Sequence, residues 1–107
     1  MEKFIFVYIT NPDKETAKRI AKILLQNKLI ACANIYNIDS LYCWEEKIAD
    51  EIEFVLIGKT VESKYDAIIE KVQKNHPYSI PCVIKIPLQE INEPYAKWLT
   101  NEINEEK

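Results

Sequence analysis

The chain has one histidine, His76, which lies in the stretch NHPYSIPCVIKIP six residues before Cys82. Imidazole and thiolate groups both bind copper and zinc, so this spacing raises the question of a metal site. One histidine makes a poor metal site in a monomer, but a symmetric assembly would offer several copies of each ligand. In such an assembly, His76 of one copy and a carboxylate of the next, Glu51 or Glu53, are the candidate metal ligands.

A second interpretation gives His76 no ligand role. The residues 75–77, Asn-His-Pro, end a predicted helix, where the helix dipole favours a positive charge and the ring bonds locally. Cys82 falls on the alternation of a predicted strand, which is typical of a small core residue. Cys43 is expected to be the most exposed thiol, and the absence of a C-x-x-C pair argues against an iron–sulfur site or a paired-thiolate metallochaperone.

Aromatic and basic residues offer a second kind of site. Four aromatic side chains could line a pocket for a planar ligand, although such residues more often anchor a core or an interface: Tyr42, Trp44, Tyr78 and Trp98. Lys59, next to Thr60 at the end of a strand, could hold an anion or form a salt bridge with Glu53 or Asp50. The sequence leaves these alternatives open.

The elements that would position these residues follow from hydrophobic periodicity. We expect strands at residues 3–9, 30–44, 48–60 and 82–88, helices at 14–26 and 63–74, and a short helix from Pro94. Pro12 is expected in the first turn of the first helix, and Thr60 or Ser63 is expected to cap the second. The order βαββαβ predicts an α+β ferredoxin-like sandwich with a terminal helix and both long helices on one sheet face, in a single domain, 1–107.

Two features predict association between copies of the chain. The strand at residues 3–9 is apolar on both faces, so something must cover the sheet face opposite the helices. A second copy is the favoured cover, and a terminal segment folded over this face is the alternative. The hairpin formed by residues 30–44 and 48–60 exceeds usual strand lengths, so its tip should project and pair elsewhere.

Composition excludes several classes of protein. The net charge of -3 and the acidic start of the third strand disfavour nucleic acid, and no apolar run could span a membrane. Three widely spaced cysteines and the lack of a signal-like start favour reduced thiols in the cytoplasm. The single glycine, Gly58, rules out glycine-rich phosphate loops, and no serine, histidine and aspartate arrangement indicates an enzyme. Few glycines and many Lys, Glu and Ile residues would suit a thermostable protein.

The stretches SLYCWEEKI, EIEFVLIGKT, NHPYSIPCVI and YAKWL, in this order and spacing, resemble the divalent-cation tolerance protein family, CutA, over nearly the whole chain. The resemblance implies a ferredoxin-like homotrimer whose long hairpins bridge subunits and which binds divalent cations such as copper or zinc at inter-subunit clefts. It implies no catalysis and no required cofactor. The family is similar in architecture to PII signalling trimers, so the alternative is a trimer that binds a small molecule or partner protein.

Carried over by position, the characteristic residues of the family would line such a cleft. They are Asn34, Ser40, Tyr42, Trp44, Lys59, Thr60, His76, Tyr78, Pro81, Tyr95 and Trp98. The chain departs from the family pattern at Glu46, where glycine is usual, at Ser79 and Cys82, where glutamates are usual, and at Ile9, where some members have a cysteine. The missing carboxylates weaken a hard-cation site, and the missing cysteine weakens a copied copper site.

Overall fold

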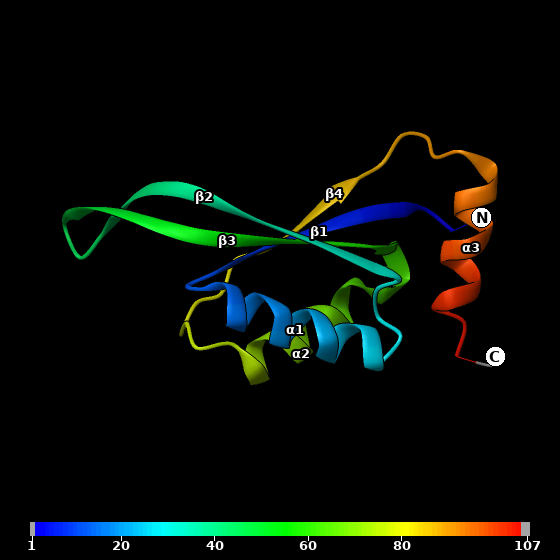
Figure 1. The fold of residues 1–107 in the computed structure, drawn as a ribbon, viewed down its shortest axis with the longest axis horizontal. Coiled ribbons are helices and arrows are strands. Elements are labelled where there is room, and N and C mark those ends of the chain that lie inside the picture. The colour runs from blue at the N-terminus through cyan, green and yellow to red at the C-terminus, as the bar shows by residue number, and fades with distance from the viewer. Residues whose placement is uncertain (1, 106–107) are drawn as a thin grey trace.

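The computed structural model describes residues 2–105 and has a four-stranded antiparallel sheet with two helices on one face (Figure 1). The elements are β1 (Phe4–Asn11), α1 (Lys14–Gln26), β2 (Cys32–Trp44), β3 (Lys47–Val61), the 3-10 turn η1 (Glu62–Lys64), α2 (Tyr65–Asn75), β4 (Val83–Pro87) and α3 (Glu93–Glu102). The strand order is β2-β3-β1-β4. This arrangement confirms the predicted ferredoxin-like α+β fold with a terminal helix.

The first helix begins where its capping chemistry predicts. Asp13 is extended, and its side chain accepts a 2.7 Å hydrogen bond from the backbone N–H of Thr16. The predicted apolar stripe is fully buried: Ala17, Ile20, Ala21 and Leu24. The placement of Pro12 in the first turn was wrong, because Asp13 takes the capping position and Pro12 therefore precedes the helix.

The second helix is not capped as expected. A 3-10 turn precedes α2, and no side chain caps either segment. Thr60 is still part of β3, and its buried hydroxyl donates to the backbone oxygen of Leu29 at 2.7 Å. Ser63 lies inside the 3-10 turn and donates to Glu2 instead. The prediction that Thr60 or Ser63 caps the helix was therefore wrong.

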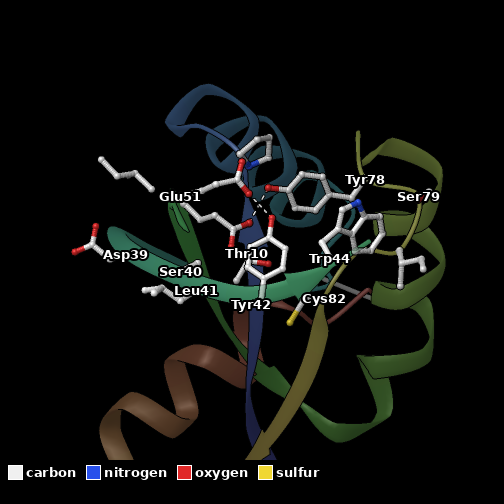
Figure 2. A pocket seen from close by; sticks show the side chains of 14 residues that line it. Thr10, Asp39, Ser40, Leu41, Tyr42, Trp44, Glu51, Tyr78, Ser79 and Cys82 are labelled. Atoms are coloured by element: carbon white, nitrogen blue, oxygen red, sulfur yellow. Dashed lines mark hydrogen bonds between the residues drawn. The ribbon is translucent and has the colours of Figure 1, made fainter. Parts of the chain in front are cut away.

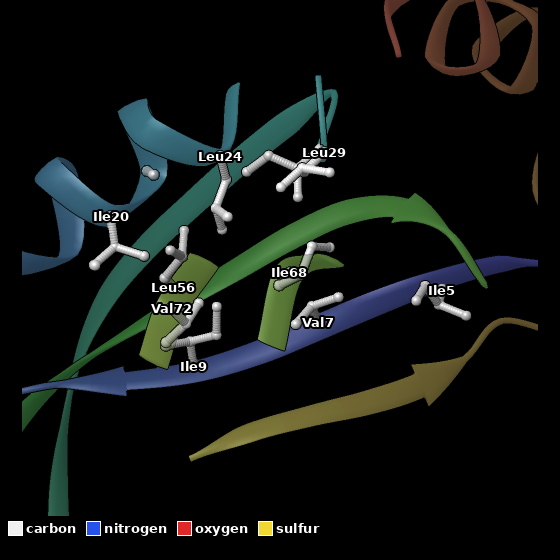
Figure 3. Close-up of a cluster of buried hydrophobic side chains, with 11 residues drawn as sticks. Ile5, Val7, Ile9, Ile20, Leu24, Leu29, Leu56, Ile68 and Val72 are labelled. Carbon is white, nitrogen blue, oxygen red and sulfur yellow. The ribbon is translucent and has the colours of Figure 1, made fainter. Parts of the chain in front are cut away.

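The main core lies between the sheet and the helices α1 and α2 (Figure 3). Alternate residues of β1 point into it, namely Ile5, Val7 and Ile9, and each is almost completely buried. Gly58 of β3 pairs with Val7, and a Cβ at this position would lie 2.9 Å from Cγ2 of Ile30. The sole glycine thus makes room for a core side chain.

The strands β2 and β3 form one continuous hairpin that projects from the sandwich (Figure 1). Pairing extends from Cys32 with Lys59 to Trp44 with Lys47, so the connecting loop has only two residues. These residues, Glu45 and Glu46, have φ angles of 50° and 65°. The molecule is 46 Å long with a radius of gyration of 14.5 Å. A compact chain of this length would have a radius of about 13 Å, so the predicted projection is confirmed.

The second sheet face is covered at one end only. Leu99 and Ile103, at and just after the end of α3, pack against Val61 and the half-buried Phe4. Farther along this face, Tyr36, Ile84 and Ile86 are exposed. The terminal segment thus supplies part of the cover, and a large apolar area stays open to a partner.

Candidate functional site

The main pocket lies between the outer part of the β2–β3 hairpin and the loop that follows α2 (Figure 2). Its volume is about 720 Å³. The lining residues are Thr10, Pro12, Asp39, Ser40, Leu41, Tyr42, Trp44, Glu51, Ile52, Glu53, Tyr78, Ser79, Ile80 and Cys82. The structure therefore brings together six of the predicted site residues: Ser40, Tyr42, Trp44, Glu51, Glu53 and Tyr78.

Two carboxylates form the polar part of this pocket. Glu51 and Glu53 are two positions apart on β3, so both side chains leave the same face of the strand. The Tyr42 hydroxyl donates to Glu51, and the Tyr78 hydroxyl donates to Oε2 of Glu53 at 2.6 Å. Glu53 is only 7% exposed. Among residues 2–105, neither glutamate forms an ion pair with a lysine or arginine.

The two tyrosines are neutral hydrogen-bond donors. The hydrogen bond to Glu51 raises the pKa of Tyr42 to about 12. Burial, and then the hydrogen bond to Glu53, raise the pKa of Tyr78 above its ordinary value. Both hydroxyls therefore keep their protons at neutral pH and orient the carboxylates. Figure 2 shows the hydroxyls and the Glu51 carboxylate turned toward one another, while the Asp39 carboxylate points away.

His76 packs against the ring of Tyr78, and both of its ring nitrogens form hydrogen bonds within the chain. Its Nε2 is 2.9 Å from the backbone oxygen of Thr10 and 3.1 Å from Oδ1 of Asn11. Its Nδ1 accepts the backbone N–H of Tyr78 at 3.1 Å. Because Nε2 faces two acceptors and Nδ1 faces a donor, the ring is the neutral tautomer with its proton on Nε2. Burial lowers the pKa of His76, which favours the same neutral form.

This arrangement bears on the predicted metal site. Within one chain, neither ring nitrogen of His76 is free for a metal ion. The expected local hydrogen bond is made by Nδ1 alone, because Nε2 contacts Thr10 and Asn11, which are distant in sequence. The positive charge expected at this helix end was wrong, since burial lowers the pKa of His76. Across residues 2–105, no three His, Cys, Asp or Glu side chains are placed to hold an ion together. The carboxylates that the two tyrosines hold in the pocket belong to Glu51 and Glu53, so a complete ligand set for an ion would need further donors.

The other predicted cleft residues lie elsewhere in the chain. Lys59 is six positions from Glu53 along β3, or about 20 Å at the rise of a strand. Its Nζ lies 5.5 Å from the centre of the Tyr95 ring, so the predicted salt bridge with Glu53 or Asp50 is not formed. The remaining members are likewise outside the pocket: Asn34 is exposed on β2, Thr60 is buried, and Trp98 packs on Tyr95.

Asn11 and Thr10 were not predicted to contribute to the site. The first strand was predicted to end at residue 9, yet β1 continues through Asn11. Asn11 follows the alternation of Ile5, Val7 and Ile9, and this pattern could have placed it on the buried face. Cys82, interpreted as a core residue, is half-buried and lines the pocket, and burial raises the pKa of its thiol.

Comparison with known proteins identifies the family. The model of the CutA1 divalent ion tolerance protein family matches residues 5–102. The chain belongs to the CutA family. It is 42% identical over 98 residues to the divalent-cation tolerance protein CutA of Pyrococcus horikoshii, covering 92% of this chain and 96% of that protein. A rice chloroplastic CutA protein is 45% identical over 102 residues, which are 94% of this chain and 58% of the rice protein.

Solved CutA structures share the fold over nearly the full chain. The structure of the periplasmic divalent cation tolerance protein CutA of Archaeoglobus fulgidus aligns with a TM-score of 0.92 at 39% identity, covering 94% of this chain and 99% of that one. CutA1 of rice aligns with the same TM-score at 44% identity, over 96% and 95%. The names of the two archaeal relatives describe divalent-cation tolerance, and none of the names states a reaction. The Archaeoglobus protein is called periplasmic and the rice protein chloroplastic. No helix within residues 2–105 is long and apolar enough to cross a membrane.

Proposed function

We propose that this CutA protein binds divalent cations such as copper or zinc as a homotrimer, with no catalytic activity, at clefts built on the Glu51 and Glu53 pocket. One observation carries the proposal: the largely buried Glu53 carboxylate has a neutral tyrosine as its hydrogen-bond partner, and no ion pair to it occurs within residues 2–105. A buried negative charge is costly unless a positive charge or further hydrogen bonds compensate it. A cation would supply that compensation.

The ligand chemistry supports divalent ions without selecting one. Carboxylate oxygens suit hard cations, whereas the Irving–Williams order makes copper the tightest divalent binder at most oxygen and nitrogen sites. Cys82 adds a soft donor to the pocket wall, although its burial keeps the thiol protonated until a metal displaces the proton. The three free cysteines also favour a reducing compartment, so we propose a cytoplasmic location.

Assembly into a trimer would complete the pocket and cover exposed apolar surface. The outer hairpin carries Leu41, Ile48 and Ile52, which are each more than 60% exposed. Side chains of this size on a projecting hairpin are typical of an interface. Neighbouring copies would then bring further donor atoms to each pocket.

The test is a calorimetric titration with Cu(II) and Zn(II), with the mass followed by light scattering. We expect a trimer that binds with a defined stoichiometry, and at least a tenfold loss of affinity in Glu51→Gln and Glu53→Gln. Glu90→Gln, which removes an exposed carboxylate outside the pocket, is the matched control and should bind as the wild type does. Equal affinity in all three variants, or binding without defined stoichiometry, would refute the proposed site.

The size of the pocket favours a second candidate function, a PII-like trimer that binds a small molecule or partner. A volume of about 720 Å³ is within the usual range of ligand sites, and Tyr42, Trp44 and Tyr78 supply aromatic walls. Hydrogen exchange of the metal-free protein with a panel of cellular metabolites would test it. Protection around Tyr42 and Trp44 by one compound would support this function, and a panel without protection would count against it.

A further inference from the structure

A closed circuit of hydrogen bonds begins and ends on adjacent residues of β3. The backbone oxygen of Phe54 accepts from Nδ2 of Asn11 at 3.0 Å, and Oδ1 of Asn11 is 3.1 Å from Nε2 of His76. Nδ1 of His76 accepts the backbone N–H of Tyr78, whose hydroxyl donates to Glu53 at 2.6 Å. The circuit joins β1, the end of α2 and the following loop to the strand that carries both pocket carboxylates.

Each link restricts the position of Tyr78. Asn11 is completely buried, and Nδ2 also donates to the backbone oxygen of Ile9, so this amide has one fixed orientation. The His76 ring is held by Asn11 and by the backbone of Thr10, and it packs against the Tyr78 ring with centroids 4.8 Å apart. Tyr78 is thus held at its backbone nitrogen, its ring and its hydroxyl.

We propose that His76 is a positioning residue of the cation pocket and that it does not bind the ion. It fixes Tyr78 so that the tyrosine hydroxyl aims the Glu53 carboxylate into the pocket. To bind a metal ion, the ring would have to give up the Tyr78 N–H on one nitrogen or two oxygen acceptors on the other. This inference rests on the proposed cation site, and it assigns to His76 the role that hydrogen-bond partners of metal ligands play.

Pulsed electron paramagnetic resonance of the Cu(II)-loaded wild-type protein separates the two roles. Because His76 is the only histidine, any coupling to an imidazole nitrogen must come from this residue. We expect bound copper without imidazole coupling. Imidazole coupling would overturn the positioning role while leaving the cation site intact. An absence of bound copper would instead remove the proposed site itself, so the two failures are distinguishable.

Variants provide the second readout. His76→Ala should weaken Cu(II) binding about 10 to 100-fold, the usual effect of removing a partner of a metal ligand. His76→Asn keeps an oxygen that can accept the Tyr78 N–H, so it should recover part of the affinity. Tyr78→Phe should cost little more in the His76→Ala background, because both changes break the same circuit. Unchanged Cu(II) affinity in His76→Ala, or losses in the double variant that equal the sum of the two single losses, would overturn the proposal. Light scattering of each variant checks that the assembly is intact.

Discussion

Replacing Glu46 by glycine should stabilise the protein, because the hairpin turn forces two glutamates into the left-handed region. Trp44 pairs with Lys47, so Glu45 and Glu46 are the only connecting residues, with φ angles of 50° and 65°. Two-residue hairpin loops with positive φ at both positions favour Asn-Gly or Asp-Gly, since glycine has no Cβ to clash. Glu46 therefore carries conformational strain that glycine would relieve.

The magnitude follows from two opposing effects. The left-handed conformation costs an L-residue roughly 1–2 kcal/mol. The stabilisation from relieving this strain is partly offset, by about 0.4–1 kcal/mol, because glycine increases the entropy of the unfolded chain. The net expectation is a gain in the free energy of unfolding of about 0.5–1 kcal/mol per chain, or a rise in Tm of about 2–4 °C at this chain length.

Thermal unfolding by calorimetry at several protein concentrations tests this, because concentration dependence separates dissociation from unfolding. Glu46→Ala removes the same charge but keeps the Cβ, so its Tm should stay near that of the wild type. Glu90→Gly makes the same change of residue where φ is not positive, and it should lower Tm. A Tm of Glu46→Gly at or below that of Glu46→Ala would refute the strain argument.

Three further changes test other parts of the fold. Gly58→Ala should reduce the urea midpoint, at a cost of about 1–3 kcal/mol, because the new methyl group meets Ile30 at 2.9 Å. Asp13→Ala should lower Tm because it removes the cap of α1, whereas Asp13→Asn keeps a side-chain oxygen that can accept the same hydrogen bond. The hydrogen bond from Thr16 lowers the pKa of Asp13, so the wild type should lose the stability that the charged cap contributes as acid protonates the carboxylate. Burial lowers the pKa of His76, so protonating this ring favours the unfolded chain. As pH falls below about 6.5, the urea midpoint of the metal-free wild type should therefore decrease more steeply than that of His76→Asn.

The fold could be predicted because its periodicities are strong and local. The buried stripe of α1 and the alternation of β1 correspond directly to their apolar residues. Errors occurred at boundaries, where backbone geometry decides. The predicted strands left residues 45–47 as the connection, yet Lys47 already pairs with Trp44 and only Glu45 and Glu46 turn the chain. The predicted cap of α2 was wrong for the same reason, since Thr60 belongs to the preceding strand, β3.

The candidate site was only partly predictable because it depends on contacts distant in sequence. The alternation of β3 placed Glu51 and Glu53 on one face, and the projecting hairpin implied an exposed tip. Nothing in the sequence indicated that Nε2 of His76 would lie between Thr10 and Asn11, which are more than 60 positions away. A histidine that binds a metal ion and a histidine that positions another residue look the same in a sequence, and only their hydrogen-bond partners distinguish them.

Two substitutions within the pocket increase the importance of this circuit. Ser79 and Cys82, which stand where the resemblance to the CutA pattern would place glutamates, both line the pocket. Burial raises the pKa of the Cys82 thiol, so it adds no negative charge at neutral pH. The charge available to a cation in the pocket therefore depends mainly on Glu51 and Glu53. With so few carboxylates, a misdirected Glu53 would remove a large share of the attraction, and the residues that hold it in place should affect binding more than they would in a pocket with glutamates at those two positions.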